Sequence, residues 1–130
     1  MNKPAELKLQ TVPAWIAGRT HLPAGRAGDV YNPATGQVSK RVAFCGADTI
    51  DAAVKAAAAA LPGWRGTTPL RRSRIMQRFL QLMQEHQKEL AGIIVEEHGK
   101  TFPDAMGSVQ RGIEVIEFAC GIPHLLKGEF

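Results

Sequence analysis

Cysteine is scarce in this chain and long hydrophobic runs are absent, and both features restrict the kind of protein it can be. Its 130 residues include two cysteines, Cys45 and Cys120, too few for the disulfide framework of a small secreted domain. Both have apolar sequence neighbours, so we expect buried thiols in an intracellular protein. The sequence has neither a signal-peptide-like hydrophobic segment nor an apolar run of about 18 residues. These absences predict a cytoplasmic protein with no membrane-spanning helix.

Aromatic residues are also few, at 6% of the chain against 45% for all hydrophobic residues. Aliphatic side chains and alanine must therefore supply most of the core. The formal net charge is +4, and five arginines form a basic cluster in the sequence. They are Arg65, Arg71, Arg72, Arg74 and Arg78. Because no aromatic residues are interleaved among them for base stacking, we expect an acidic neighbour, such as another subunit, rather than nucleic acid.

Three common motifs of functional sites are missing. The histidines have no metal-ligand spacing with the two cysteines, and no G-x-G-x-x-G follows a predicted strand. Gly99-Lys100-Thr101 resembles the end of a phosphate-binding P-loop, but position 94, where that motif begins with glycine, is Ile94. Neither cysteine has a visible activating base. We therefore expect no metal site, no cofactor-binding residue and no catalytic residue within this chain.

Turn signals and alternation predict short strands in the first 45 residues. We expect strands at residues 15–17, 29–31 and 38–45, with a loop over residues 21–28. The run Asn32-Pro33-Ala34-Thr35-Gly36 is a strong turn signal, because asparagine can bond to its own backbone and glycine tolerates a positive φ. In an extended conformation, residues 38–45 place Val38, Lys40, Val42 and Phe44 on one side and Ser39, Arg41 and Ala43 on the other. This pattern predicts a half-buried strand that forms a hairpin with the strand before it.

From Asp48 onward the spacing of apolar residues is helical. The sequence predicts four helices: residues 48–61, ended by Pro62-Gly63; a second from Thr68-Pro69 to a polar break at 84–88; a third ending at Gly99; and a fourth from Thr101 to about Gly121. Strands precede helices without alternating with them. This order predicts an α+β arrangement.

Arg111 is the most informative candidate site residue. On a helical wheel, Val115, Phe118 and Ile122 fall within about 40° of it, so its guanidinium projects from an apolar stripe. A buried guanidinium needs an anionic partner. One interpretation is an intramolecular ion pair with Glu114 or another carboxylate; the other is a bidentate clamp on a substrate carboxylate. The spacing alone favours the intramolecular pair.

Several segments together resemble the start of the aldehyde dehydrogenase superfamily. They are Trp15-Ile16-Ala17-Gly18-Arg19, Val30-Tyr31-Asn32-Pro33-Ala34-Thr35-Gly36, Ile50-Asp51-Ala52-Ala53-Val54 with the alanine run to Trp64, and Glu96-Glu97-His98-Gly99-Lys100. The resemblance covers roughly residues 12–130, and residues 1–11 are expected to be a flexible N-terminus. Within the last predicted helix, the run from Gly107 to Cys120 is similar to the CoA-acylating methylmalonate-semialdehyde dehydrogenase subgroup.

The resemblance implies that the chain is part of the α/β NAD-binding domain of an oxidoreductase. The complete enzyme would oxidise methylmalonate or malonate semialdehyde with NAD and CoA, as in valine catabolism, and would be a dimer or tetramer of identical subunits. Arg111 matches the arginine that binds the carboxylate of the substrate. A weaker implication is a monovalent cation near the backbone of Val30 and the carboxylate of Glu97.

The resemblance also implies what this chain lacks. The nucleophilic cysteine, its activating glutamate and the cofactor-binding glycines of the superfamily match no residue before position 130. We therefore expect the chain by itself to bind neither NAD nor CoA and to be inactive. The alternative interpretation is a truncated, non-catalytic product or a module that binds a protein partner.

Overall fold

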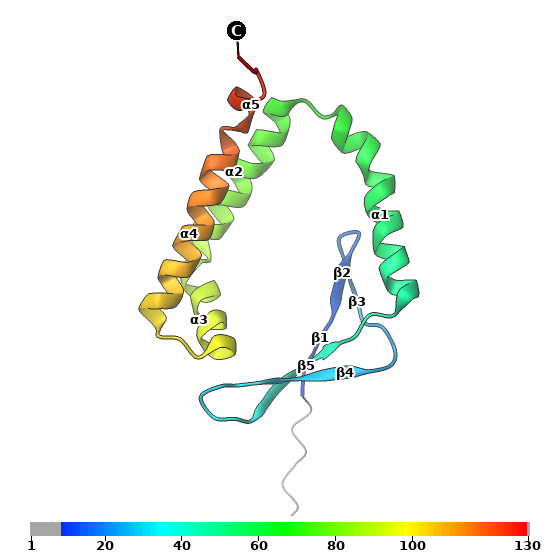
Figure 1. The fold of residues 1–130 in the computed structure, drawn as a ribbon, viewed down its shortest axis with the longest axis vertical. Coiled ribbons are helices and arrows are strands. Elements are labelled where there is room, and N and C mark those ends of the chain that lie inside the picture. The colour runs from blue at the N-terminus through cyan, green and yellow to red at the C-terminus, as the bar shows by residue number, and fades with distance from the viewer. Residues whose placement is uncertain (1–8, 130) are drawn as a thin grey trace, which may run out of the picture. The chain divides into compact units, whose positions relative to one another are not determined.

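A computed structural model describes residues 9–129 and contains short strands followed by helices (Figure 1). This order confirms the predicted α+β class. The chain divides into two units, Met1–Leu61 and Pro62–Phe130. Residues 1–8 of the segment expected to be flexible lie outside the described residues. At its other end, the Gln10 carbonyl accepts a hydrogen bond from the Arg41 N–H at 2.9 Å.

Five short strands form two small sheets in the first unit. They are β1 (Thr11–Val12), β2 (Ala14–Ile16), β3 (Arg19–His21), β4 (Ala27–Tyr31) and β5 (Val38–Ala43). In the larger sheet, β5 lies between β1, which is parallel to it, and β4, which is antiparallel. The smaller sheet is the β2–β3 hairpin. Strand β3 is not predicted by the sequence; it follows a turn in which Ala17 and Gly18 both have positive φ, as a type I′ hairpin turn requires.

The turn predicted at residues 32–36 is confirmed, and it joins β4 to β5 as a hairpin. The Asn32 Oδ1 atom accepts a hydrogen bond from the Ala34 N–H at 2.9 Å. The Gly36 N–H donates to the Asn32 carbonyl at 2.8 Å, and Gly36 has a φ of 68°. The asparagine and the glycine therefore perform the roles for which turns select them.

The first unit buries little of its surface. None of its described side chains is buried, and Phe44 remains 48% exposed although its ring lies against Gly28. A Cβ atom on Gly28 would lie 2.6 Å from the Phe44 ring, so this contact requires glycine. Cys45 is exposed, and its expected burial is therefore wrong. Strand β5 ends at Ala43, so Cys45 lies in the connection to the first helix rather than on the sheet.

Among the described residues, five helices follow the strands. They are α1 (Ala47–Gly66), α2 (Pro69–Glu85), α3 (Gln87–His98), α4 (Phe102–Cys120) and α5 (Ile122–Leu125). The short α5 is additional to the four predicted helices. The predicted end of the first helix at Pro62-Gly63 is wrong, because α1 continues to Gly66. Proline removes one N–H donor but has a helical φ, and the Thr67 hydroxyl donates to the Gly63 carbonyl at 3.0 Å beyond it.

Helices α2, α3 and α4 pack together and form the core of the second unit. Its buried hydrophobic residues are Ala91, Ala105, Val109 and Ile113. Around them, half-buried side chains of α2, α3 and α4 complete the contact. Ser73 is also buried, and its hydroxyl donates to the Cys120 carbonyl at 2.7 Å. This bond joins the start of α2 to the end of α4, where the half-buried Cys120 lies.

The start of α4 is fixed by Thr101, as the sequence predicts. Its hydroxyl accepts a hydrogen bond from the Asp104 N–H at 3.4 Å and donates to the Asp104 carboxylate at 2.8 Å. We expect Thr101→Ala to lower the free energy of unfolding by about 1 kcal/mol, because an N-terminal N–H loses its acceptor. Urea denaturation followed by circular dichroism measures this change. Thr101→Ser, which keeps the hydroxyl, is the control; an equal loss in both variants would show that the cap does not stabilise the helix.

Candidate functional site

Arg111 lies in α4 on the face that points away from the core. The core-facing residues of this helix are Ala105, Val109 and Ile113, whereas Arg111 is exposed and Val115 is 70% exposed. The predicted burial of the guanidinium is therefore wrong. Helix α4 has two apolar faces, and α2 and α3 cover the one that is about half a turn from Arg111.

The predicted ion pair between Arg111 and Glu114 is absent from the structure. The Glu114 carboxylate accepts a hydrogen bond from Gln110 Nε2 at 3.3 Å. The Arg111 guanidinium instead donates from Nη2 to the Ser108 hydroxyl at 3.3 Å. No carboxylate of residues 9–129 pairs with Arg111 in this structure. The guanidinium is thus an accessible cation whose fork is open to an anion from outside this segment.

Sequence reasoning missed two residues beside Arg111. The Ser108 hydroxyl also accepts a hydrogen bond from Lys100 Nζ at 2.9 Å, so a second cation lies close to the guanidinium. Ser108 stands three residues before Arg111, a spacing that places both on one face of a helix. This spacing in the sequence is a signal that could have identified Ser108 as a neighbour of Arg111. Lys100 lies in the α3–α4 connection, where its position depends on tertiary packing.

The weaker cation-site residues lie in different units. Val30 belongs to β4, and its carbonyl accepts a hydrogen bond from the Ser39 hydroxyl at 3.2 Å. Glu97 belongs to α3 and is exposed. A monovalent-cation site that uses both remains a prediction. Across residues 9–129, no group of three or more histidine, cysteine, aspartate or glutamate residues could hold a metal ion.

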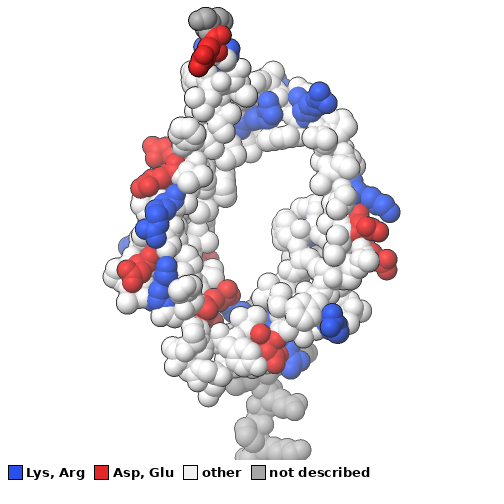
Figure 2. All heavy atoms as spheres, in the orientation of Figure 1, with Lys and Arg blue, Asp and Glu red and all other residues white. Residues whose placement is uncertain are grey.

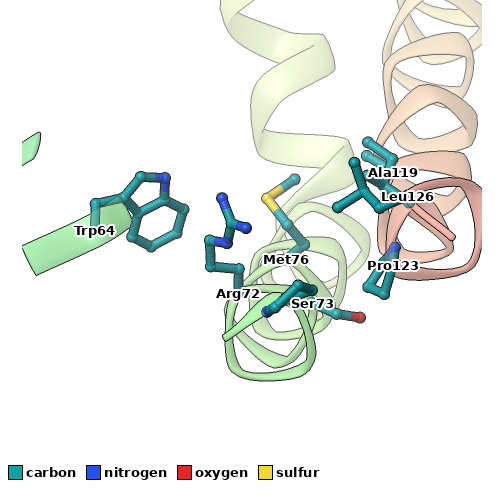
Figure 3. A pocket seen from close by; sticks show the side chains of 9 residues that line it. Trp64, Arg72, Ser73, Met76, Ala119, Pro123 and Leu126 are labelled. Atoms are coloured by element: carbon teal, nitrogen blue, oxygen red, sulfur yellow. The ribbon is translucent and has the colours of Figure 1, made fainter. Parts of the chain in front are cut away.

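An apolar pocket lies within the second unit, between the start of α2 and the segment that includes the end of α4 and α5 (Figure 3). Its volume is about 220 Å³. The lining residues are Trp64, Pro69, Arg72, Ser73, Met76, Ala119, Ile122, Pro123 and Leu126. Arg72 lies over the Trp64 ring, 6.0 Å from its centroid. The lining offers a hydrophobic surface rather than reacting groups, and Arg111 is not part of it.

On the face that Figure 2 shows, residues other than lysine, arginine, aspartate and glutamate cover broad areas. Large hydrophobic side chains are exposed in both units, among them Trp15 at 70% and Phe118 at 68%. Exposed apolar surface of this extent is characteristic of regions that contact other protein. None of the helices within the described residues is both long and apolar enough to cross a membrane.

Most of the chain matches one known protein family. The profile of the aldehyde dehydrogenase family matches residues 21–130. The chain belongs to the aldehyde dehydrogenase family. This confirms the resemblance noted in the sequence.

Within the family, the chain is similar to malonate-semialdehyde dehydrogenases. The chain is 44% identical over 115 residues to a malonate-semialdehyde dehydrogenase of Pseudomonas aeruginosa. The matched region covers 88% of this chain and 23% of that protein. It is 45% identical over 115 residues to malonate-semialdehyde dehydrogenase 2 of Geobacillus thermodenitrificans, with the same two coverages. This aldehyde dehydrogenase segment thus spans about a quarter of the length of the relatives it matches.

Solved structures of methylmalonate-semialdehyde dehydrogenases also resemble this chain. The methylmalonate-semialdehyde dehydrogenase of Oceanimonas doudoroffii is 45% identical and superimposes with a TM-score of 0.91, covering 93% of this chain and 25% of that one. A methylmalonate-semialdehyde dehydrogenase from Sinorhizobium meliloti, solved with NAD, is 42% identical with a TM-score of 0.90, covering 96% and 26%. The described fold is therefore that of one part of an aldehyde dehydrogenase.

The connection from β5 to α1 does not have the glycine-rich sequence of a dinucleotide-binding turn. Gly46 is the single glycine in the connection from β5 to α1, which has the residues Phe44, Cys45 and Gly46. A pyrophosphate site uses a glycine-rich turn between a strand and a helix. Cys45 is exposed and Cys120 is half-buried. That the segment alone binds neither NAD nor CoA stays a prediction.

Proposed function

We propose that this chain is the N-terminal part of an NAD-dependent, CoA-acylating methylmalonate- or malonate-semialdehyde dehydrogenase, and that Arg111 binds the carboxylate of the substrate. One observation carries the proposal. In a segment 44% identical to a malonate-semialdehyde dehydrogenase, the exposed Arg111 has no carboxylate partner among the described residues. A semialdehyde of a dicarboxylic acid carries one carboxylate, which the planar guanidinium can bind with two parallel hydrogen bonds.

In the proposed enzyme, this segment orients the substrate and the remainder of the enzyme carries out the reaction. Arg111 would hold one end of the substrate, so that the aldehyde at the other end meets the thiolate of a cysteine outside this chain. NAD would accept the hydride and CoA the acyl group. Holding the substrate at both ends converts binding energy into correct orientation of the reacting carbon.

A second observation supports an association with other protein surface. Exposed hydrophobic residues greatly outnumber the four buried hydrophobic residues of the described chain, and such surface is stabilised by contact with further protein. We therefore propose that the complete enzyme is a homo-oligomer and that the segment alone has a partner-binding surface rather than an activity. The exposed, unpaired Cys45 thiol suits the reducing cytoplasm.

A substrate comparison tests the proposed function. The complete enzyme that contains this segment should form NADH and an acyl-CoA from malonate semialdehyde, and NADH formation should require CoA. Propionaldehyde, which has the same carbon chain without the carboxylate, should have a kcat/KM at least about tenfold lower, the value of one hydrogen bond to a charged group. Equal kcat/KM for the two aldehydes, or a free acid as the product, would contradict the proposal.

The 130-residue chain alone provides the matching negative control. We expect it to form no NADH with malonate semialdehyde, NAD and CoA, because neither cysteine has the environment of an activated nucleophile. Activity that is abolished by Cys45→Ala or Cys120→Ala would show that this segment contains its own nucleophile.

A further inference from the structure

Ser108 has a hydroxyl group whose hydrogen-bonding capacity is fully used. A serine hydroxyl donates one hydrogen bond and accepts two. It donates to the Asp104 carbonyl at 3.2 Å, and it accepts from Lys100 Nζ at 2.9 Å and from Arg111 Nη2 at 3.3 Å. The bond to the carbonyl four residues earlier holds the side chain in one orientation. Its two acceptor sites therefore point in fixed directions, one toward each cation.

The two cations that meet at Ser108 share one neutral oxygen atom. Lys100 Nζ and Arg111 Nη2 both donate to the Ser108 hydroxyl, and Asp104, in the same turn of α4, uses its carboxylate to accept from the Thr101 hydroxyl at 2.8 Å. Two positive charges held by one oxygen repel each other. Lys100 is also half-buried, which makes an uncompensated charge more costly. The arrangement is relieved when a carboxylate binds both groups.

A glycine lies beside the Arg111 guanidinium, so no side chain occupies that position. Gly107 lies four residues before Arg111, on the same side of α4. A Cβ atom at Gly107 would lie 3.8 Å from Arg111 Nη1, within ordinary van der Waals contact. Because glycine stands there, the volume that a larger side chain would occupy next to the guanidinium is left open.

We propose that Lys100 is a second cationic contact for the carboxylate that Arg111 binds. In this proposal Ser108 is the positioning residue, because its hydroxyl keeps the two cationic groups close together. The inference rests on the proposed function of Arg111. The guanidinium supplies directional hydrogen bonds, and the ammonium supplies a point charge beside them. Together they select substrates with an acid group at the end opposite the aldehyde.

Substitutions at Lys100 and Ser108 in the complete enzyme test the inference. Lys100→Met should raise the KM for malonate semialdehyde about tenfold, and Ser108→Ala should raise it about fivefold, with propionaldehyde kinetics changed less than twofold. Ser108→Thr keeps a hydroxyl that can bond to the same carbonyl and should restore most of the affinity. Lys88→Met, which removes an exposed lysine of α3, is the matched control and should leave both KM values unchanged.

Coupling between the two positions distinguishes positioning from general destabilisation. If Ser108 acts through the cations, the double variant Ser108→Ala/Lys100→Met should raise the KM by less than the product of the single effects. Equal effects of Lys100→Met on both aldehydes, or none on either, would overturn the inference. If Ser108→Ala inactivates the enzyme toward propionaldehyde as well, Lys100→Met and Ser108→Thr decide the question, since each leaves the Ser108 position hydroxylated.

The outcome for Arg111 separates this inference from the proposed function. If Arg111→Ala discriminates between the two aldehydes and Lys100→Met does not, only the role of Lys100 and Ser108 fails. If neither variant discriminates, the carboxylate-binding function itself fails.

Discussion

Arg111→Ala in the complete enzyme should raise the KM for malonate semialdehyde by about 10- to 100-fold and change propionaldehyde kinetics by less than about twofold. The reason is that hydrogen bonds to a charged group each contribute about 1.5–3 kcal/mol. In this structure the guanidinium makes one bond, to Ser108, and stabilises no core contact. Its removal should therefore affect the substrate that carries a carboxylate and leave the fold intact.

Two further substitutions sharpen this prediction. Arg111→Lys keeps the charge and loses the planar fork, so it should recover only part of the affinity. Arg78→Ala removes another exposed arginine, whose Nη1 lies 3.9 Å from the Glu85 carboxylate, and should change neither substrate's kinetics. Steady-state rates of NADH formation with each aldehyde measure these effects. An equal rise in KM for both aldehydes would reduce Arg111 to a residue that supports the local structure.

Ile113→Ala should destabilise the second unit by about 2–4 kcal/mol. Ile113 is 3% exposed and is one of four buried hydrophobic residues in the described chain, so its truncation leaves a cavity in a core with few residues to close it. Val115→Ala, two residues away in the same helix but 70% exposed, should change the stability by less than about 0.5 kcal/mol.

Urea denaturation of the 130-residue chain, followed by helical circular dichroism, measures both variants. The Ile113 variant should unfold at a clearly lower urea concentration than the wild-type chain, and the Val115 variant at nearly the same concentration. Equal midpoints for the two variants would mean that the α2–α3–α4 contact does not hold the second unit together.

Local chemistry in the sequence predicts much of this fold. The Asn32–Gly36 turn, the Thr101 cap and the glycine at the end of α3 are each determined by interactions within a few residues, and all three are confirmed. The end of α1 is not predictable in this way, because Pro62 is compatible with both a helix end and a continued helix. The short α5 follows Gly121 directly and has no separate start signal beyond its proline.

The candidate site is less predictable from sequence than the fold. Helix α4 carries apolar residues on two faces, and the sequence does not say which face the neighbouring helices cover. Arg111 was consequently expected to be buried and is exposed. The contact between Lys100 and Ser108 depends on how the α3–α4 connection folds back against α4, which no spacing rule describes.

The hydroxyl of Ser108 gathers its partners from one uninterrupted stretch, residues 100–111. Groups that recognise a ligand are commonly scattered along a chain, and changing them together requires independent substitutions at distant codons. On the proposed roles of Lys100, Ser108 and Arg111, a single short exchange between related genes would transfer the ammonium, the hydroxyl and the guanidinium together. We therefore expect the proposed preference for a carboxylated aldehyde to change in one recombination event.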